Sequence, residues 1–278
     1  MAARAGTLSG PPLPLHAILW LFALLTVFPF GLLLLTSLKS QPDLLRGAFT
    51  LPDRPHFENF VSAWVDGHFG TYFLNSILVV VPVVAVSVAL GFLSGFAFAF
   101  LTLPFKRTLF VILTFGMMVP TEAFIIPLYY EMRLFHISNT YAALILPQIA
   151  MSMPFSTLFT ASAMRQLPPE IIEAAILDGA SRPEILWRVM LPLLSPAVST
   201  LALFLFIWTW NEFLIPLILV SDDAVRTLPI GMLFFQGKYT VNIPVLTAGA
   251  VIIVFPIIVV YLFFQRKFIE GLTAGAVK

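Results

Sequence analysis

The sequence predicts an all-α integral membrane protein with six transmembrane helices. Of its 278 residues, 59% are apolar and only 10% are charged, whereas soluble domains have roughly a quarter charged residues. The apolar residues form long stretches without any Asp, Glu, Lys or Arg, each near the roughly 20 residues that a helix needs to cross the hydrocarbon core. This composition excludes a water-soluble enzyme. The net charge of +1 and the lack of a basic run argue against a nucleic-acid partner.

The uncharged stretches locate the predicted spans, and the third of them is interrupted only by Glu122. The predicted spans cover residues 15–37, 72–101, 108–130, 141–163, 195–220 and 244–264. Proline removes a backbone donor and can kink a helix. Eight prolines interrupt the predicted spans and could bend them: Pro29, Pro82, Pro120, Pro127, Pro147, Pro154, Pro216 and Pro256. Gly91 and Gly95 in the second span form a GxxxG pattern, which permits close approach of another helix, here expected within the same chain.

The positions of Lys and Arg predict that both termini are cytoplasmic. The turn Lys106-Arg107 and the pair Arg266-Lys267 adjoin span ends on the side of the amino terminus, and basic residues near span ends favour the cytoplasm. We therefore expect one transmembrane domain over residues 1–278. It comprises a first span with an outer loop (1–71), core spans (72–264) that include a cytoplasmic loop (164–194), and a cytoplasmic tail (265–278).

The loop at 164–194 is predicted to begin with a short helix. Pro169 suits a first helical turn and Glu170 favours its dipole. Residues Ile172, Ala175 and Ile176 recur at helical spacing and predict an apolar face. Gly179 follows as a left-handed stop.

A second short helix is predicted to follow. Ser181 and Glu184 fit a capping box, and the helix is expected to end before Leu191-Pro192. Its apolar face is predicted to carry Ile185, Leu186 and Val189. Two helices that present apolar residues to water are typical of a protein contact. The alternative is an interfacial helix that lies on lipid headgroups.

The spacing Glu173-Ala174-Ala175-x-x-x-Gly179, then nine residues, then Val189-x-Leu191-Pro192 resembles the EAA loop of binding-protein-dependent ABC importer permeases. Val189 stands where that pattern usually has isoleucine. Other stretches resemble the sugar branch, notably the second permease subunit of maltose-type and glycerol-3-phosphate-type importers. These stretches are Ile126-Pro127-Leu128-Tyr129, Asn139-Thr140, Trp210-Asn211-Glu212-Phe213 and the carboxy-terminal Gly271-Leu272-Thr273-Ala274-Gly275-Ala276-Val277-Lys278.

The resemblance implies a permease subunit that imports a sugar across a prokaryotic plasma (inner) membrane. Its implied partners are a second homologous permease, two cytoplasmic ATPase subunits and an extracytoplasmic sugar-binding protein. The loop would couple to the ATPases through Glu173, Ala174, Ala175, Asp178, Gly179 and Arg182. This chain is expected to bind no cofactor itself, because it lacks a Gly-x-x-x-x-Gly-Lys-Ser/Thr loop for phosphate. ATP and Mg²⁺ would bind the partner subunits.

Polar and aromatic residues within the spans are candidates for the substrate path. They are Glu122, Trp208, Trp210, Asn211 and Glu212. Acids inside spans are functional candidates, and a sugar needs hydrogen-bonding groups beside flat aromatic faces. The alternative is that these residues pack within the bundle or at the membrane interface. A second hypothesis is an ion-coupled secondary transporter with Glu122 and Glu212 as relay carboxylates. The residues form no recognisable catalytic or metal-ligating set.

Overall fold

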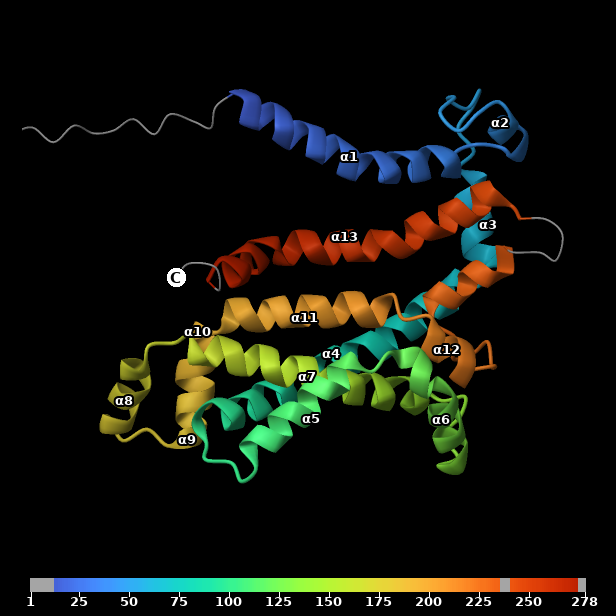
Figure 1. Ribbon diagram of the computed structural model, residues 1–278. Coiled ribbons are helices and arrows are strands. Elements are labelled where there is room, and N and C mark those ends of the chain that lie inside the picture. The colour runs from blue at the N-terminus through green and yellow to red at the C-terminus, as the bar shows by residue number, and fades with distance from the viewer. Residues whose placement is uncertain (1–12, 236–240, 275–278) are drawn as a thin grey trace, which may run out of the picture. The chain divides into compact units, whose positions relative to one another are not determined.

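A computed structural model describes residues 13–235 and 241–274, and helices dominate these ranges (Figure 1). The chain divides into two compact units. The first comprises Met1–Gly67 and Phe234–Ile252, and the second comprises His68–Leu233 and Ile253–Lys278.

In the first unit, α1 (Leu13–Ser37) leads to an outer segment that contains α2 (Gln41–Leu45) and α3 (Glu58–Asp66). This segment is folded around polar contacts. The ammonium group of Lys39 is buried and donates to the carbonyl oxygens of Gly47 at 3.0 Å and Ala48 at 2.8 Å. Asn59 donates to the carbonyl oxygen of Lys39 at 2.8 Å, so the chain after the first span is held close to the end of α1.

In the second unit, α4 (Phe69–Phe100) and α7 (Tyr141–Arg165) pack along each other. A Cβ atom at Gly91 or Gly95 would clash with Ser156 or Thr160. The GxxxG pattern therefore serves packing within the chain, as predicted. Hydroxyl groups line the same contact, and Ser152 Oγ donates to Ser87 Oγ at 2.7 Å.

The predicted third span is two helices, α5 (Lys106–Met118) and α6 (Thr121–Leu134), which meet at 98°. The break lies at Val119 and Pro120, which have extended backbone ψ angles of 118° and 143°. Proline disfavours helical geometry in the preceding residue, so the kink expected at Pro120 is a complete break.

The predicted fifth span is also interrupted. Helix α11 (Ser195–Trp210) ends before Asn211, and the short helix α12 (Leu214–Leu219) follows. The chain continues through the 3₁₀ segment η2 (Leu228–Phe235) to α13 (Ile243–Ala274). The predicted tail 265–278 therefore begins as a continuation of α13, and residues 275–278 lie outside the described residues.

Four helices of the described chain are long and apolar enough to cross a membrane, namely α1, α4, α7 and α13. The number rises to six if each of two bent pairs counts as one span. The pairs are α5 with α6, and Arg182–Leu193 with α11, which are bent by 78°. The expectation of an all-helical membrane protein is confirmed, and the count of six stays a prediction.

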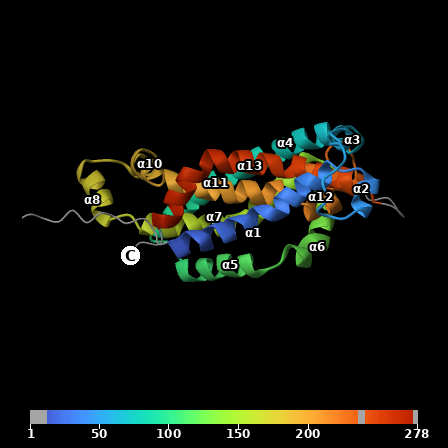
Figure 2. The same cartoon turned by 90° about the horizontal axis from the view of Figure 1, so that it is seen from above.

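The loop between α7 and α11 contains α8 (Pro169–Leu177), α9 (Arg182–Glu184), the π-helical segment η1 (Ile185–Met190) and α10 (Leu191–Leu193). Figures 1 and 2 place α8 at one end of the second unit and α6 and α12 at the other.

Candidate functional site

Helix α8 ends in a motif that needs glycine. Gly179 has a φ angle of +81°, and its N–H donates to the carbonyl oxygen of Ile176 at 3.0 Å. The N–H of Ala180 reaches back to the carbonyl oxygen of Ala175, also at 3.0 Å. These two bonds form a Schellman motif. The predicted left-handed stop is confirmed, and it sets the direction in which the loop turns.

The predicted capping box after this turn is also confirmed. The N–H and the Oγ of Ser181 donate to Glu184 Oε2 at 3.0 Å and 2.8 Å. These bonds, together with nearby Arg188, lower the pKa of the Glu184 carboxyl from its ordinary value. The carboxylate of Glu184 thus fixes the start of the second helix at neutral pH.

Two expectations about the second helix are wrong. The helix does not end before Leu191-Pro192, because η1 and α10 continue it to Leu193, with Pro192 in the first turn of α10. Its apolar face does not point to water either. Ile185 and Leu186 are buried in one cluster with Phe92 of α4 and Met164 of α7. Met190, at the end of η1, belongs to the same cluster.

The second helix, which is described in full, keeps only Trp187 and Leu193 as half-exposed large apolar side chains, and the most exposed apolar residue of the loop lies on α8. Ile172 and Ala175 pack partly against the buried cluster, whereas Leu177 is 87% exposed and Ile176 is 58% exposed. Glu173 and Ala174 are exposed beside them, as are Asp178 and Arg182. This exposed surface, which we call the α8 surface, combines a carboxylate with small and apolar side chains. It is therefore smaller than the two-helix face that the sequence predicted.

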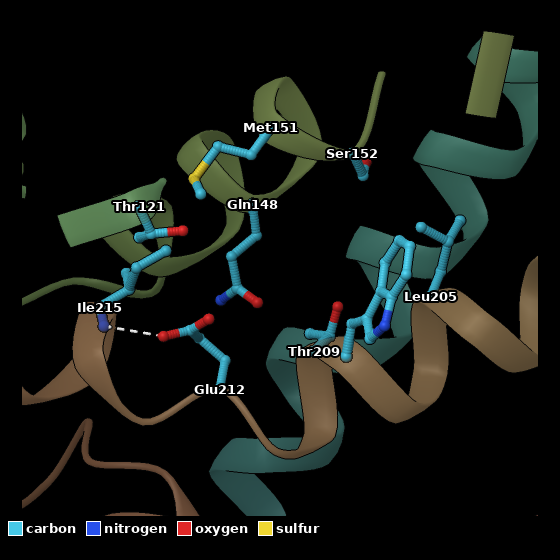
Figure 3. Close-up of a pocket in the computed structure, with 9 residues that line it drawn as sticks. Thr121, Gln148, Met151, Ser152, Leu205, Thr209, Glu212 and Ile215 are labelled. Atoms are coloured by element: carbon cyan, nitrogen blue, oxygen red, sulfur yellow. Dashed lines mark hydrogen bonds between the residues drawn. The ribbon is translucent and has the colours of Figure 1, made fainter. Parts of the chain in front are cut away.

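A cavity of about 230 Å³ opens between α6, α7, α11 and α12 of the second unit (Figure 3). We call it the polar cavity. It is lined by Thr121, Gln148, Met151, Ser152, Leu205, Trp208, Thr209, Glu212 and Ile215.

One amide group, that of Gln148, and one carboxylate, that of Glu212, form the centre of the polar part of this cavity. Gln148 of α7 and Glu212 project into the same space from opposite sides (Figure 3). Glu212 Oε1 accepts a bond from the N–H of Ile215 at 3.0 Å, in the first turn of α12, and Gln148 Nε2 donates to the carbonyl oxygen of Leu144 at 2.9 Å. Each side chain is thus oriented by one bond and keeps further capacity for a ligand.

Trp208 adds an aromatic surface to the same cavity. Its ring is half exposed and meets the ring of Phe155 edge-on, with centroids 4.8 Å apart. The polar side chains of Gln148 and Glu212 beside the indole ring are the kinds of group that bind a neutral, hydroxyl-rich molecule.

The structure brings two of the five candidate substrate-path residues together, Trp208 and Glu212. Trp210 is buried on the other side of α11, where its Nε1 donates to the carbonyl oxygen of Ile253 at 3.0 Å. Asn211 Nδ2 donates to the carbonyl oxygen of Ile207 at 2.8 Å. Glu122 is exposed on the first turn of α6 and does not line the polar cavity, although its neighbour Thr121 does.

Sequence reasoning missed Gln148, Thr121 and Thr209. A neutral amide or hydroxyl does not interrupt an apolar stretch as a charge does. The available signal was the single glutamine of the fourth span, which is buried and therefore needs hydrogen-bond partners.

Several apolar helices that enclose a polar cavity define a multi-pass integral membrane protein. The chain belongs to the family of binding-protein-dependent transport system inner membrane components, which matches residues 87–272. It is accordingly a multi-pass protein of the plasma membrane.

Curated relatives extend over nearly the whole chain. The diacetylchitobiose uptake system permease protein NgcG of Streptomyces coelicolor is 34% identical over 94% of this chain and 87% of its own length. The arabinooligosaccharides transport system permease protein AraQ of Halalkalibacterium halodurans is 33% identical over 92% of each chain. The trehalose/maltose transport system permease protein MalG of Thermococcus litoralis is 35% identical over 93% and 94%.

A solved structure shares the fold. A chain of a bacterial ABC transporter involved in the import of the acidic polysaccharide alginate superposes with a TM-score of 0.73 at 22% identity. The match covers 96% of this chain and 99% of that chain.

Proposed function

We propose that this chain is a transmembrane permease subunit of an ATP-binding-cassette importer that moves an oligosaccharide, disaccharide or sugar derivative into the cytoplasm. The polar cavity carries the proposal, because it sets hydrogen-bonding groups beside the indole of Trp208 inside a family of transport subunits. Three relatives bear the names of saccharide systems, which supports this substrate class.

The proposed topology has six spans and cytoplasmic termini, with α5 and α6 together forming the third span and α11 and α12 together forming the fifth. The first span and outer loop occupy residues 1–71, the core spans 72–264, the coupling loop 164–194 and the tail 265–278. The turn Lys106-Arg107 and the α8 loop lie at one end of the second unit, opposite α6 and α12 (Figure 1). This arrangement supports one cytoplasmic end.

The proposed contact with the ATPase subunits is the α8 surface. Glu173 would pair with a basic residue of the ATPase, and the small side chains of Ala174 and Ala175 would allow close seating. Asp178 and Arg182 flank the turn at Gly179, whose Schellman motif holds the two helices of the loop at a fixed angle. ATP and Mg²⁺ would bind the two ATPase partners, whose closure would switch the bundle between two states.

The proposed substrate path runs through the polar cavity, with Trp208 and Glu212 as contacts and Gln148 as a further one. Trp210, Asn211 and Glu122 are assigned to packing, helix termination and the α6 surface in this proposal. A second permease and an extracytoplasmic binding protein would complete the path.

The test is reconstitution of this chain with its co-purifying subunits in proteoliposomes. Saccharide uptake that requires ATP and an external binding protein is the expected result. Uptake by the isolated chain, driven by an ion gradient alone, would replace the proposal with a secondary transporter.

A further inference from the structure

A second cavity lies at the other end of α7 from the polar cavity. It has a volume of about 370 Å³ and lies between the carboxy-terminal part of α4, the start of α5 and the last turns of α7. Phe98, Phe110 and Leu158 form its apolar part, and Ser162, Arg165 and Gln166 form its polar part. No carboxylate lines it. We call it the Arg165 cavity.

Arg165 is held at the meeting point of two helix ends. It lies in the last turn of α7, and its Nη2 donates to the carbonyl oxygen of Phe98, in the last turn of α4, at 3.1 Å. A guanidinium has five N–H donors, and the side chain is exposed. The guanidinium therefore keeps N–H donors that are free to bind a phosphate.

Two further cations, Lys106 and Arg107, begin α5, the helix that contributes Phe110 to the cavity. Lys106 lies one helical turn before Phe110 and so shares the face of α5 that lines the cavity. Arg107 follows it. Within the described ranges, no carboxylate forms an ion pair with Lys106, Arg107 or Arg165, whereas Arg188 of the nearby loop pairs with Glu184 at 3.2 Å. The cavity thus joins an apolar wall to an uncompensated positive charge.

We propose that the Arg165 cavity binds an anionic phospholipid, with the acyl chain against Phe98, Phe110 and Leu158 and the phosphate on Arg165. Basic cavities between transmembrane helices on the cytoplasmic side are suited to anionic headgroups. The proposal rests on the proposed topology in one respect, namely that the lipid comes from the cytoplasmic leaflet. A bound lipid would fill the angle between α5 and α7, next to the coupling loop.

The test uses the assembled complex in nanodiscs made from equal amounts of phosphatidylethanolamine and phosphatidylglycerol. A phosphatidylglycerol analogue with a photoactivatable acyl chain is added, and labelled peptides are mapped by mass spectrometry. We expect labelling within residues 158–166 of α7. Loss of one basic group near a membrane surface weakens anionic-lipid binding about fivefold, so we expect labelling to fall about fivefold in Arg165→Gln and in Lys106→Gln.

Arg133→Gln is the matched control, because it removes the same charge from the last turn of α6, at the opposite end of the unit. Lys106→Gln removes no hydrogen bond of the described structure, so it decides the question even if Arg165→Gln fails to assemble. Unchanged labelling in Arg165→Gln overturns the proposal, and if that variant does not assemble, unchanged labelling in Lys106→Gln does so. Equal labelling by a phosphatidylethanolamine analogue, or full competition by free glycerol phosphate, also overturns it. Saccharide uptake is measured separately, so failure of lipid labelling leaves the proposed transport function standing.

Discussion

Thr160 Oγ1 donates to the carbonyl oxygen of Gly91 at 2.6 Å, joining α7 to α4 across 69 residues of chain. The contact is possible because neither Gly91 nor Gly95 has a side chain between the helices. Residues of this helix pair line the Arg165 cavity and cover the buried side chains of the α8 loop, and α7 also lines the polar cavity.

The first prediction concerns this contact. In Gly95→Ala the new methyl group would clash with Thr160, and overpacking of this kind costs about 2 kcal/mol. We expect a lower midpoint of thermal unfolding for the purified complex. Gly31→Ala is the matched control, since nothing described lies within 4 Å of a Cβ there. Equal midpoints for both variants would contradict the packing account.

The second prediction concerns the turn after α8. Gly179 has open space around it, so only its φ angle of +81° demands glycine. A β-branched residue is strained in this region, whereas asparagine adopts it more readily. We expect Gly179→Val to reduce saccharide uptake at least tenfold, while Gly179→Asn keeps most of it. Membrane levels are compared by immunoblot, and equal uptake by the two variants would argue against a conformational role.

The third prediction separates the polar cavity from its neighbour in sequence. Glu212→Gln keeps an acceptor for the N–H of Ile215 but removes the charge from the cavity. We expect the saccharide KM to rise about tenfold, because one charged hydrogen bond to the substrate, worth roughly 1.5 kcal/mol, is lost. Asn211→Ala, which alters a residue bonded to Ile207 outside the cavity, should leave KM unchanged. The reverse pattern in uptake kinetics would exclude Glu212 as a contact.

The fourth prediction concerns pH. The bonds from Ser181 lower the pKa of Glu184 in the folded loop, so their stabilisation is present above the unfolded pKa, about 4.5. It is lost as the pH falls below that value towards the folded pKa. We expect Ser181→Ala to raise the pKa of Glu184 and, at neutral pH, to speed exchange of the Ile185 amide, which donates to the carbonyl oxygen of Ser181 at 2.9 Å. Hydrogen exchange followed by mass spectrometry measures this, and unaltered exchange would show that the box does not hold the helix start.

Local signals in the sequence predicted much of this structure. The Ser181–Glu184 box and the stop at Gly179 each depend on a few neighbouring residues, so they follow from the sequence alone. At Pro120 the sequence predicted only a possible kink, as at seven other prolines, and not the complete break that separates α5 from α6. The two helices that meet there at 98° pack against different neighbours, α5 against α7 and α6 against α12. The angle could not be predicted from the residues of α5 and α6.

The burial of Ile185 and Leu186 shows the same limit in the coupling loop. Helical spacing identified them as an apolar face, but their covering residues Phe92 and Met164 lie in earlier spans. The polar cavity was only half predicted for a related reason. Trp208 and Trp210 are two positions apart in α11, so helical geometry places them on different sides of the helix. Which side meets the cavity and which is buried depends on how α11 packs against the other helices.

The most direct test of the coupling assignment is a thiol crosslink. The chain contains no cysteine, so Ala174→Cys introduces a unique thiol on the exposed α8 surface. The control is Leu45→Cys, which places a thiol on the proposed outer side, at a side chain that is 90% exposed. With a short bifunctional reagent applied to the purified complex, we predict that position 174 crosslinks to a co-purifying ATPase and that position 45 does not. Failure of position 174 to crosslink in an assembled, ATP-hydrolysing complex, or its labelling by an impermeant maleimide outside intact cells, would contradict the account.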